Sequence, residues 1–471
     1  MQQQEIRSLK LFQEMVHKVP AYKKFLGQHG IRPGSVKTAA WLAEIPAINK
    51  KNYFSQFPVS ETFWPKSKQE PLVVTSTSGS TGQPAYFLRN EKIDWQYSVL
   101  AEFFLKNGPK GSTLLINCFG MGVWIGGLIT YQAFRYAALR GYPLSIVTPG
   151  INKTEIFHCL GRLAPNFENI IFAGYPPFIK DVIDEALEEK INLSKLKIRL
   201  LFAAESFTET FRDYVARKAN VRNIYLDTLN IYGSAELGAM AFETPGSIFI
   251  RRQSLKHPRI YEQLFIKGRL PTLAQYNPMF VSFEEKNGEI LINADGAMPI
   301  FKYSIGDRGG TLTLGKIEKI FAGEGINLRR LVAKNHISFQ NLPFVYIYER
   351  ADFSTKLYGA TIYPEPIKEV AQRGPLAEYL TGKFTMQTKF NRKQNQTLEI
   401  NFELKRETKP TKKLRFAVQK AVIAELVKKN AEYKNNYSVV PHKVLPKIVL
   451  WPHSSTLYFK PGIKQKWIKK A

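Results

Sequence analysis

Residues 169–233 read NIIFAGYPPFIKDVIDEALEEKINLSKLKIRLLFAAESFTETFRDYVARKANVRNIYLDTLNIYG, and apolar runs alternate there with amphipathic ones. The apolar runs at 169–174, 198–204 and 229–233 are short and rich in β-branched and aromatic residues, which predicts strands. Between them, Phe178–Lys190 and Thr208–Lys218 have helical spacing. This alternation favours βαβ units around a largely parallel sheet, so an α/β fold is predicted.

The pattern extends in both directions from this stretch. Towards the N-terminus it continues in three more predicted strands, at 72–74, 113–117 and 144–148. Residues 5–16 place apolar side chains on one helical stripe, and helices broken by proline loops are predicted from there to about residue 70. Towards the C-terminus, residues 280–320 are rich in strands and turns, with hairpin-like turns at Asn287-Gly288 and Asp295-Gly296.

Length and charge predict two domains. A chain of 471 residues rarely forms one core, and 44% hydrophobic with 13% aromatic residues excludes a disordered chain. The formal net charge is +28, which attracts polyanions such as nucleotides and coenzymes. Residues 351–471 hold 24 Lys/Arg and nine Asp/Glu, and a strand-like 397–404 precedes a helix-like 412–429. We therefore predict a large domain at 1–350 and a smaller, basic α+β domain at 351–471.

Several protein classes are excluded by simple features. Cys118 and Cys159 cannot form a disulfide framework and suit a reducing compartment. The N-terminus lacks the layout of a signal peptide, and the apolar stretch 121–134 is too short to span a bilayer. The seven histidines show no metal-ligand spacing. A cytoplasmic protein without a membrane span is predicted.

The first stretch that could carry chemistry is VTSTSGSTGQP at 74–84, which follows an apolar run and holds six hydroxyls with Gly79 and Gly82. Small residues let successive backbone N–H groups face an anion, and hydroxyls add donors to phosphate oxygens. No lysine follows the second glycine, so this is not a Walker loop. Taken alone, such a run is also typical of a plain surface loop.

Two further stretches carry polar side chains next to glycines. In NIYGSAELG at 230–238, Tyr232 offers a ring that can stack on a base and Glu236 a carboxylate that can bind Mg²⁺. In MPIFKYSIGD at 298–307, Asp307 follows a glycine turn and could accept hydrogen bonds from a ribose diol. Each stretch alone is equally compatible with an ordinary strand–turn corner.

The order of the three stretches resembles the adenylate-forming superfamily of acyl-CoA synthetases, luciferases and adenylation domains, and most closely its phenylacetate–CoA ligase-like branch. The resemblance covers nearly the whole chain. Other segments similar to that branch are VPAY at 19–22, IPAINK at 45–50, GYPPF at 174–178, FAAES at 202–206 and the hinge-like segment 346–367. It implies a large adenylation domain with mixed sheets and a mobile α+β C-terminal domain.

The resemblance also implies a role for individual residues. The phosphates of ATP would be held by Ser78, Gly79, Ser80, Thr81 and Gly82. Adenine and ribose would be held by Ala204, Glu205, Tyr232, Gly233, Ser234 and Asp307, with Mg²⁺ on Glu236. The acid pocket would be lined by Phe119, Trp124, Gly126, Gly127 and Tyr175. Asp352 would be the hinge and Lys464 the catalytic lysine, with Lys460 and Lys466 as rivals.

The chain departs from the family pattern at three places. Ala85 stands where most of the superfamily has lysine, Ala235 replaces the usual Thr/Ser before Glu236, and Ser304-Ile305 stands where Arg-Thr is common. These leave open an altered nucleotide geometry or a degenerate site.

The reading that follows is ATP-dependent activation of an aryl or acyl carboxylic acid as acyl-adenylate, with transfer to coenzyme A. An alternative acceptor is an acidic carrier protein, an amine or another molecule, which the basic C-terminal domain would suit. A third reading, a nucleic-acid-binding protein on this scaffold, rests on the +28 charge alone, since no nucleic-acid-binding signature is present. The identity of the acid and the oligomeric state, a homodimer included, stay open.

Overall fold

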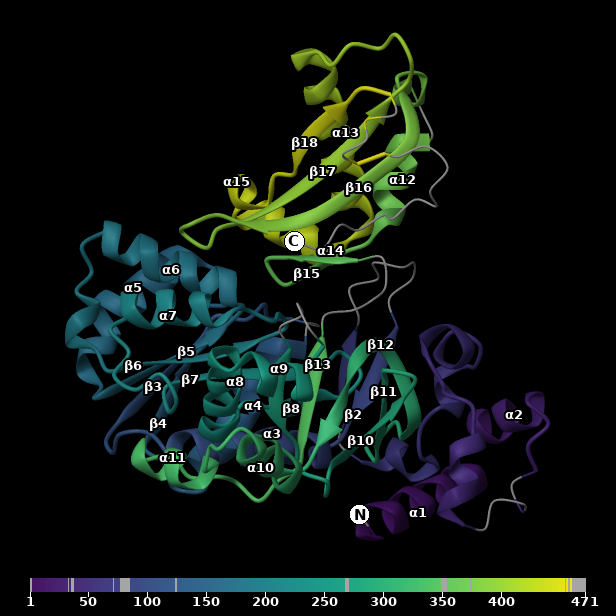
Figure 1. Cartoon of the computed structure of the whole chain (residues 1–471), viewed down its shortest axis with the longest axis vertical. Coiled ribbons are helices and arrows are strands. Elements are labelled where there is room, and N and C mark those ends of the chain that lie inside the picture. The colour runs from purple at the N-terminus through teal and green to yellow at the C-terminus, as the bar shows by residue number, and fades with distance from the viewer. Residues whose placement is uncertain are drawn as a thin grey trace. The chain divides into compact units, whose positions relative to one another are not determined.

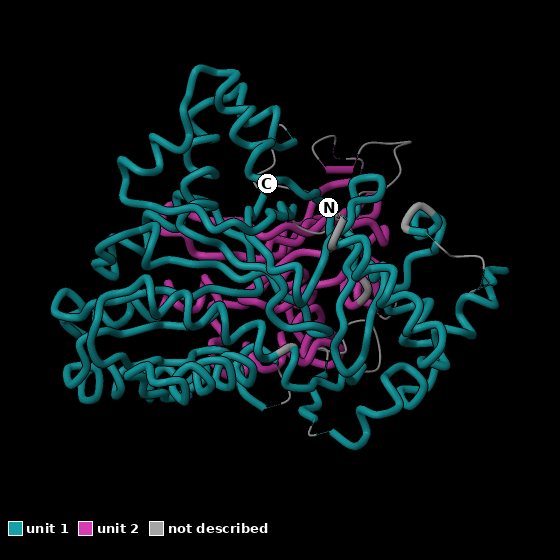
Figure 2. The backbone as a smooth tube through the Cα atoms, turned by 90° about the horizontal axis from the view of Figure 1, so that it is seen from below, with its two compact units in different colours: residues 1–76, 85–174, 182–351 teal, residues 77–84, 175–181, 352–471 magenta. Residues whose placement is uncertain are grey.

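The computed structural model describes residues 2–32, 34, 38–70, 72–76, 85–122, 125–266, 271–348, 354–372, 375–453, 455 and 458–459. Contacts group the chain into two compact units (Figure 2). Unit 1 comprises residues 1–76, 85–174 and 182–351, and unit 2 comprises residues 77–84, 175–181 and 352–471. Among the described residues, no helix has both the length and the apolar character needed to cross a bilayer.

Unit 1 is built on an eleven-stranded mixed sheet with the order β10-β11-β12-β13-β9-β8-β7-β6-β5-β3-β4 (Figure 1). One half is parallel: β3 (Thr113–Asn117), β4 (Leu144–Val147), β5 (Asn169–Gly174), β6 (Ile198–Ala203) and β7 (Thr228–Ser234). The other half is antiparallel: β8 (Gly238–Phe242), β9 (Thr272–Gln275), β10 (Val281–Lys286), β11 (Glu289–Ala294), β12 (Ile300–Leu312) and β13 (Phe344–Tyr348).

The remaining elements of unit 1 are helices and one separate hairpin, β1 (Val73–Ser76) with β2 (Tyr86–Arg89). The helices are α1 (Gln2–Lys18), α2 (Pro20–Gln28), α3 (Glu91–Lys106), α4 (Ile125–Leu139), α5 (Lys153–His158), α6 (Pro176–Glu188), α7 (Glu209–Lys218), α8 (Pro245–Lys256), α9 (Pro258–Leu264), α10 (Leu314–Gly323) and α11 (Leu328–Lys334). The first residues of α6, up to Asp181, are grouped with unit 2.

The predicted α/β fold is confirmed in its central elements. Strand β5 has the predicted bounds, and the run predicted at 198–204 forms β6 with every residue from Ile198 to Phe202 buried, as expected for a central parallel strand. Helix α7 begins after Thr208, whose side chain accepts the N–H of Phe211 at 3.1 Å. At the predicted turn, Asn287 and Gly288 both have positive φ (55° and 77°), which a two-residue hairpin loop requires.

The N-terminal segment packs on the antiparallel half of the sheet. A core cluster joins side chains of α1 and α2, such as Phe12 and Phe25, to Phe301 and Tyr303 of β12. Beyond α2, Ile48 pairs with β12 and is not part of a helix. Its N–H donates to Lys302 O (3.1 Å), and its carbonyl accepts the Ser304 N–H (2.8 Å). This segment therefore holds the middle of β12 in place.

Unit 2 is built around the three-stranded sheet β16-β17-β18 (Figure 1). Its described elements are β14 (Thr355–Leu357), β15 (Ala360–Ile362), α12 (Pro364–Gln372), β16 (Leu380–Phe390), β17 (Gln396–Leu404), α13 (Lys412–Lys429), α14 (Ala431–Val439), α15 (Pro441–Val444) and β18 (Lys447–Trp451). Helix α13 has the predicted bounds, with Thr411 capping it by accepting Leu414 N–H at 3.1 Å. The hinge-like segment 346–367 begins inside β13 of unit 1.

Glu399 forms ion pairs with Lys389 and Lys447 on the sheet of unit 2, and we predict from them that the stability of the protein depends on pH. The Glu399 carboxylate is buried; burial alone would raise its pKa, but hydrogen bonds from Lys389 and Lys447 outweigh this and lower the pKa to about 2. Its contribution to stability is therefore complete above pH 4.5, the ordinary value, and is lost as pH falls towards 2. Because both lysines are exposed, we expect Glu399→Gln to cost about 1 kcal/mol at pH 7.

Urea unfolding of the wild type and of Glu399→Gln at pH values from 7 to 3 measures this difference. The gap between the two midpoints should narrow below about pH 4.5. A gap that stays constant over the whole range would show that the charge of Glu399 plays no part in stability.

Candidate active site

Tyr232 and Glu236 lie on the tight hairpin that joins β7 to β8. Residues 235–237 form its turn, so Glu236 is half-buried at the tip. Only glycine fits at position 233, because a Cβ there would lie 2.5 Å from the carbonyl oxygen of Gly238. Gly238 itself has φ +73°, in the left-handed region. Both glycines of the YGSAELG stretch are thus required by the hairpin, which fixes where Glu236 stands.

The second and third sequence stretches meet in the structure. The Tyr232 hydroxyl donates a hydrogen bond of 2.6 Å to the Asp307 carboxylate, although 75 residues separate them. Asp307 lies in β12, is 9% exposed, and follows Gly306, which has φ +85°. A ring and a carboxylate in contact, one from each stretch, are what a site for a base and its attached ribose needs.

Tyr303 links the same two stretches a second time. Its hydroxyl donates to the Glu236 carboxylate at 2.9 Å, and the residue is 1% exposed. Ile48 pairs with its strand. In the sequence, Tyr303 is the tyrosine of the Tyr-x-x-Gly-Asp pattern at 303–307, but no role was predicted for it. Glu236 is thus oriented by a buried phenol.

A buried arginine donates a hydrogen bond to the turn between β7 and β8. Arg89, 2% exposed, lies at the end of β2 and donates to Leu237 O (3.2 Å) and to Asp94 (3.3 Å). Burial raises the pKa of Asp94 and lowers that of Arg89, and the attraction between the two opposes both shifts. The strand that follows the Ser78–Gly82 loop in sequence is thereby tied to the turn that carries Glu236.

The loop 204–208, between β6 and α7, carries the predicted adenine residues. Ala204 has φ +76° and is exposed, whereas Glu205 is 6% exposed. The Glu205 carbonyl accepts a hydrogen bond of 3.1 Å from the Asn230 side chain on β7. The structure therefore connects the loop directly to the strand that continues into Tyr232, Gly233 and Ser234.

Of the predicted acid-pocket wall, Phe119 lies between β3 and α4, and Gly126 and Gly127 lie in the first turn of α4. Phe119 is 1% exposed, and a Cβ on Gly126 would lie 3.4 Å from its ring. At Gly127 a Cβ would lie 2.5 Å from Gly120 O, and the Gly127 carbonyl accepts the Asn117 amide at 2.8 Å. Close approach thus requires glycine at 127, while the role of this segment in binding an acid stays a prediction. Tyr175, also predicted for this pocket, belongs to unit 2.

Several predicted site residues lie outside the described residues: Ser78, Gly79, Ser80, Thr81, Gly82, Trp124, Asp352, Lys460, Lys464 and Lys466. The strands before and after residues 78–82 are described, and Ser76 of β1 pairs with Tyr86 of β2 in antiparallel orientation. The roles of these residues stay predictions.

The described residues are better suited to a Mg²⁺ ion that is bound together with the nucleotide phosphates than to an ion held by the protein alone. Among them, no group of three or more His, Cys, Asp or Glu side chains is arranged to hold a metal. Mg²⁺ usually binds through one or two carboxylates and the substrate's phosphates, and keeps several waters. The half-buried carboxylate of Glu236 suits that arrangement.

Comparison with known proteins finds two relatives, both from the branch that the sequence stretches resemble. The chain is 22% identical over 385 residues to a phenylacetate–coenzyme A ligase of Aromatoleum evansii, covering 79% of this chain and 77% of that one. It is 23% identical over 237 residues, half of each chain, to a phenylacetate–coenzyme A ligase of Thermus thermophilus. No family model matches.

The solved structures show the same fold. A 2-hydroxyisobutyryl-CoA ligase, in complex with 2-HIB-AMP and CoA, matches with a TM-score of 0.64 and 14% identity, over 100% of this chain and 90% of the other. The same ligase in its postadenylation state gives a TM-score of 0.55. By sequence the chain is similar to phenylacetate–coenzyme A ligases, and it shares its fold with a 2-hydroxyisobutyryl-CoA ligase.

Proposed function

We propose that this chain is an AMP-forming acid–thiol ligase that activates a carboxylic acid with ATP and transfers the acyl group to coenzyme A. The observation that carries the proposal is the contact of Tyr232 with Asp307 beside the hairpin that presents Glu236. The named activity of the relatives supports it, as does the fold shared with a ligase solved with an acyl-adenylate and CoA.

In the first step, a carboxylate oxygen of the acid attacks the α-phosphorus of ATP. The bond from that phosphorus to the oxygen bridging the β-phosphate breaks, and pyrophosphate leaves. Two anions approach each other, so fixed hydrogen-bond donors and positive charge are required. Bound Mg²⁺ would supply positive charge to the phosphate oxygens. We assign the donors to Ser78–Gly82, and Glu236 would hold the ion in place.

Residues that the structure describes would position the base and the ribose of the nucleotide. Tyr232 offers its ring to the base, and the Asp307 carboxylate has two oxygens that can accept ribose hydroxyls as well as the Tyr232 hydroxyl. Ala204 and Glu205 lie on the loop tied to the same strand. In the second step, the thiolate of coenzyme A attacks the acyl carbon, the thioester forms, and AMP leaves.

Pyrophosphate exchange tests the first step. Wild-type protein, ATP, Mg²⁺ and a panel of aryl and fatty acids should give acid-dependent incorporation of labelled pyrophosphate into ATP. Product analysis with and without coenzyme A then tests the acceptor. Absence of exchange with every acid would refute the adenylation, whereas exchange without thioester formation would point to a carrier protein or an amine as acceptor.

The lysine assignment gives a separate prediction. We expect Lys464→Ala to lower pyrophosphate exchange about 100-fold, because a cation at the reacting phosphate is lost. Thioester formation from pre-formed acyl-adenylate should change little. Lys460→Ala and Lys466→Ala, made in the same chain, are the matched variants. If one of them loses exchange while Lys464→Ala does not, the assignment moves to that lysine.

A further inference from the structure

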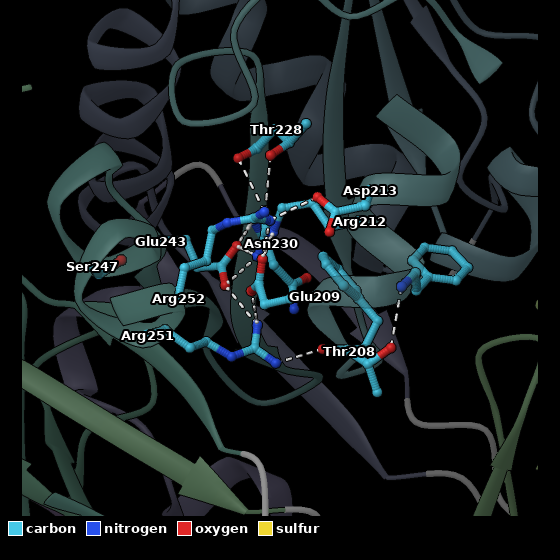
Figure 3. Close-up of polar contacts among 12 residues, drawn as sticks. Thr208, Glu209, Arg212, Asp213, Thr228, Asn230, Glu243, Ser247, Arg251 and Arg252 are labelled. Atoms are coloured by element: carbon cyan, nitrogen blue, oxygen red, sulfur yellow. Dashed lines mark hydrogen bonds and ion pairs between the residues drawn. The ribbon is translucent and has the colours of Figure 1, made fainter. Parts of the chain in front are cut away.

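A cluster of six charged side chains lies beneath the loop 204–208, and the proposed function does not use it (Figure 3). Four of the six are buried: Arg212 and Glu243 at 0% exposure, Arg251 at 2% and Glu209 at 8%. Arg252 and Asp213 complete it at the surface side. Three arginines face three carboxylates, so the cluster is neutral as a whole. Its members come from α7, from the end of β8 and from α8.

The pairs within the cluster are close, and each of the three arginines contacts two carboxylates. Arg212 Nη2 donates to both oxygens of Glu243 at 2.8 Å, and its Nε donates to Glu209 at 3.0 Å. Arg251 Nη1 lies 2.9 Å from Glu209 and 3.4 Å from Glu243. Burial alone would raise the pKa of Glu209, but the three arginines lower it, so this carboxylate is ionised.

Arg212 also donates to the carbonyl and the hydroxyl of Thr228, and other hydrogen bonds of the cluster reach the backbone around the loop 204–208. Arg251 Nη2 donates to the carbonyl of Phe207 at 2.5 Å. Glu243 Oε2 accepts the N–H of Asn230 at 3.0 Å, and the Asn230 side chain donates to the carbonyl of Glu205 at 3.1 Å. The carbonyls on both sides of Ser206 are therefore held by the same network.

The loop needs such support, because Ala204 stands in the left-handed region at φ +76°. A non-glycine residue there is strained and persists only where its surroundings fix it. Buried ion pairs cost desolvation and are a poor source of net stability, but a planar guanidinium holds its partners in defined directions. This network is therefore better suited to fixing geometry than to adding stability.

We propose that Arg251 is a positioning residue for the nucleotide, which fixes the backbone of residues 204–207 in the conformation that receives the adenosine part of ATP. The inference rests on the proposed function and deepens it. The hydrogen bonds and ion pairs of the Arg251 side chain are with the loop and with its own cluster, so Arg251 acts through the loop. Its removal should therefore change nucleotide affinity more than affinity for the acid.

The test compares Arg251→Met with Arg199→Met. Arg199 is an equally buried arginine (3%) near the start of β6, whereas the loop 204–208 follows the end of that strand. It donates to Asp227 at 2.9 Å and to the Leu226 carbonyl at 2.9 Å. Like Arg251, it has carboxylate and backbone carbonyl acceptors, but away from the loop. Arg251→Lys, which keeps the charge but not the planar fork, serves if Arg251→Met does not fold.

Two measurements on full-length protein decide the outcome: the Kd of Mg·ATP by calorimetry and amide hydrogen exchange over 203–208. For Arg251→Met we expect about a tenfold weaker Kd and faster exchange in this segment, with Arg251→Lys in between. Arg199→Met should lower the melting temperature but leave both readouts near wild type. If Arg251→Met binds ATP as wild type does, or if Arg199→Met weakens binding equally, the positioning role is refuted while the proposed function stands. Wild-type protein that does not bind ATP would overturn both.

Discussion

Replacing Glu236 by glutamine is expected to lower pyrophosphate exchange about 100-fold. Glutamine keeps the shape of the side chain and an oxygen that can accept the 2.9 Å hydrogen bond from Tyr303. What it removes is the negative charge, and an amide oxygen is a weaker ligand for Mg²⁺ than a carboxylate. The fold should be unchanged, so the loss belongs to the chemical step.

The measurement is the exchange rate at saturating acid as a function of free Mg²⁺. Glu236→Gln should require a higher Mg²⁺ concentration for its residual activity, which a purely structural defect would not produce. Asp184→Asn is the matched control, because Asp184 on α6 also accepts a tyrosine hydroxyl, that of Tyr214 at 3.0 Å. Equal losses in the two variants, or an unchanged Mg²⁺ requirement, would contradict the assignment.

The parallel half of the fold could be predicted from the sequence because its strands are continuous apolar runs. Strands such as β5 are buried on both faces, and their sequence shows it without knowledge of their neighbours. Helix α13 was predicted with the bounds that it has in the structure. The short strands of the antiparallel half were harder. β9 has four residues, and its place between β13 and β8 depends on pairing with distant segments.

The same physical reason separates the predicted from the unpredicted parts of the site. Tyr232, Glu236 and Asp307 stand in local patterns, and the order of these patterns resembles a family, which implied that they share a site. Arg212, Glu243 and Arg251 form no local pattern, and charged side chains on helices usually face solvent. Their pairing arises only when α7, β8 and α8 pack together.

The second large effect is expected at Asp307. Asparagine there keeps the shape but loses the charge that strengthens hydrogen bonds from hydroxyls, so the KM for ATP should rise about 100-fold. Tyr232→Phe is the matched variant: it removes the other partner of the 2.6 Å hydrogen bond and leaves the carboxylate to the ribose. We expect it to change the KM about threefold at most.

A comparison of ATP with 2′,3′-dideoxy-ATP makes the assignment specific. If Asp307 binds the ribose hydroxyls, the wild type should lose most of its affinity when they are absent, and Asp307→Asn should lose little more, because both changes remove the same interaction. Penalties that add in full would mean that the carboxylate acts elsewhere. Since Tyr232 and Asp307 are in contact, a role in orienting the tyrosine ring would then remain, and Tyr232→Phe would show an equal loss.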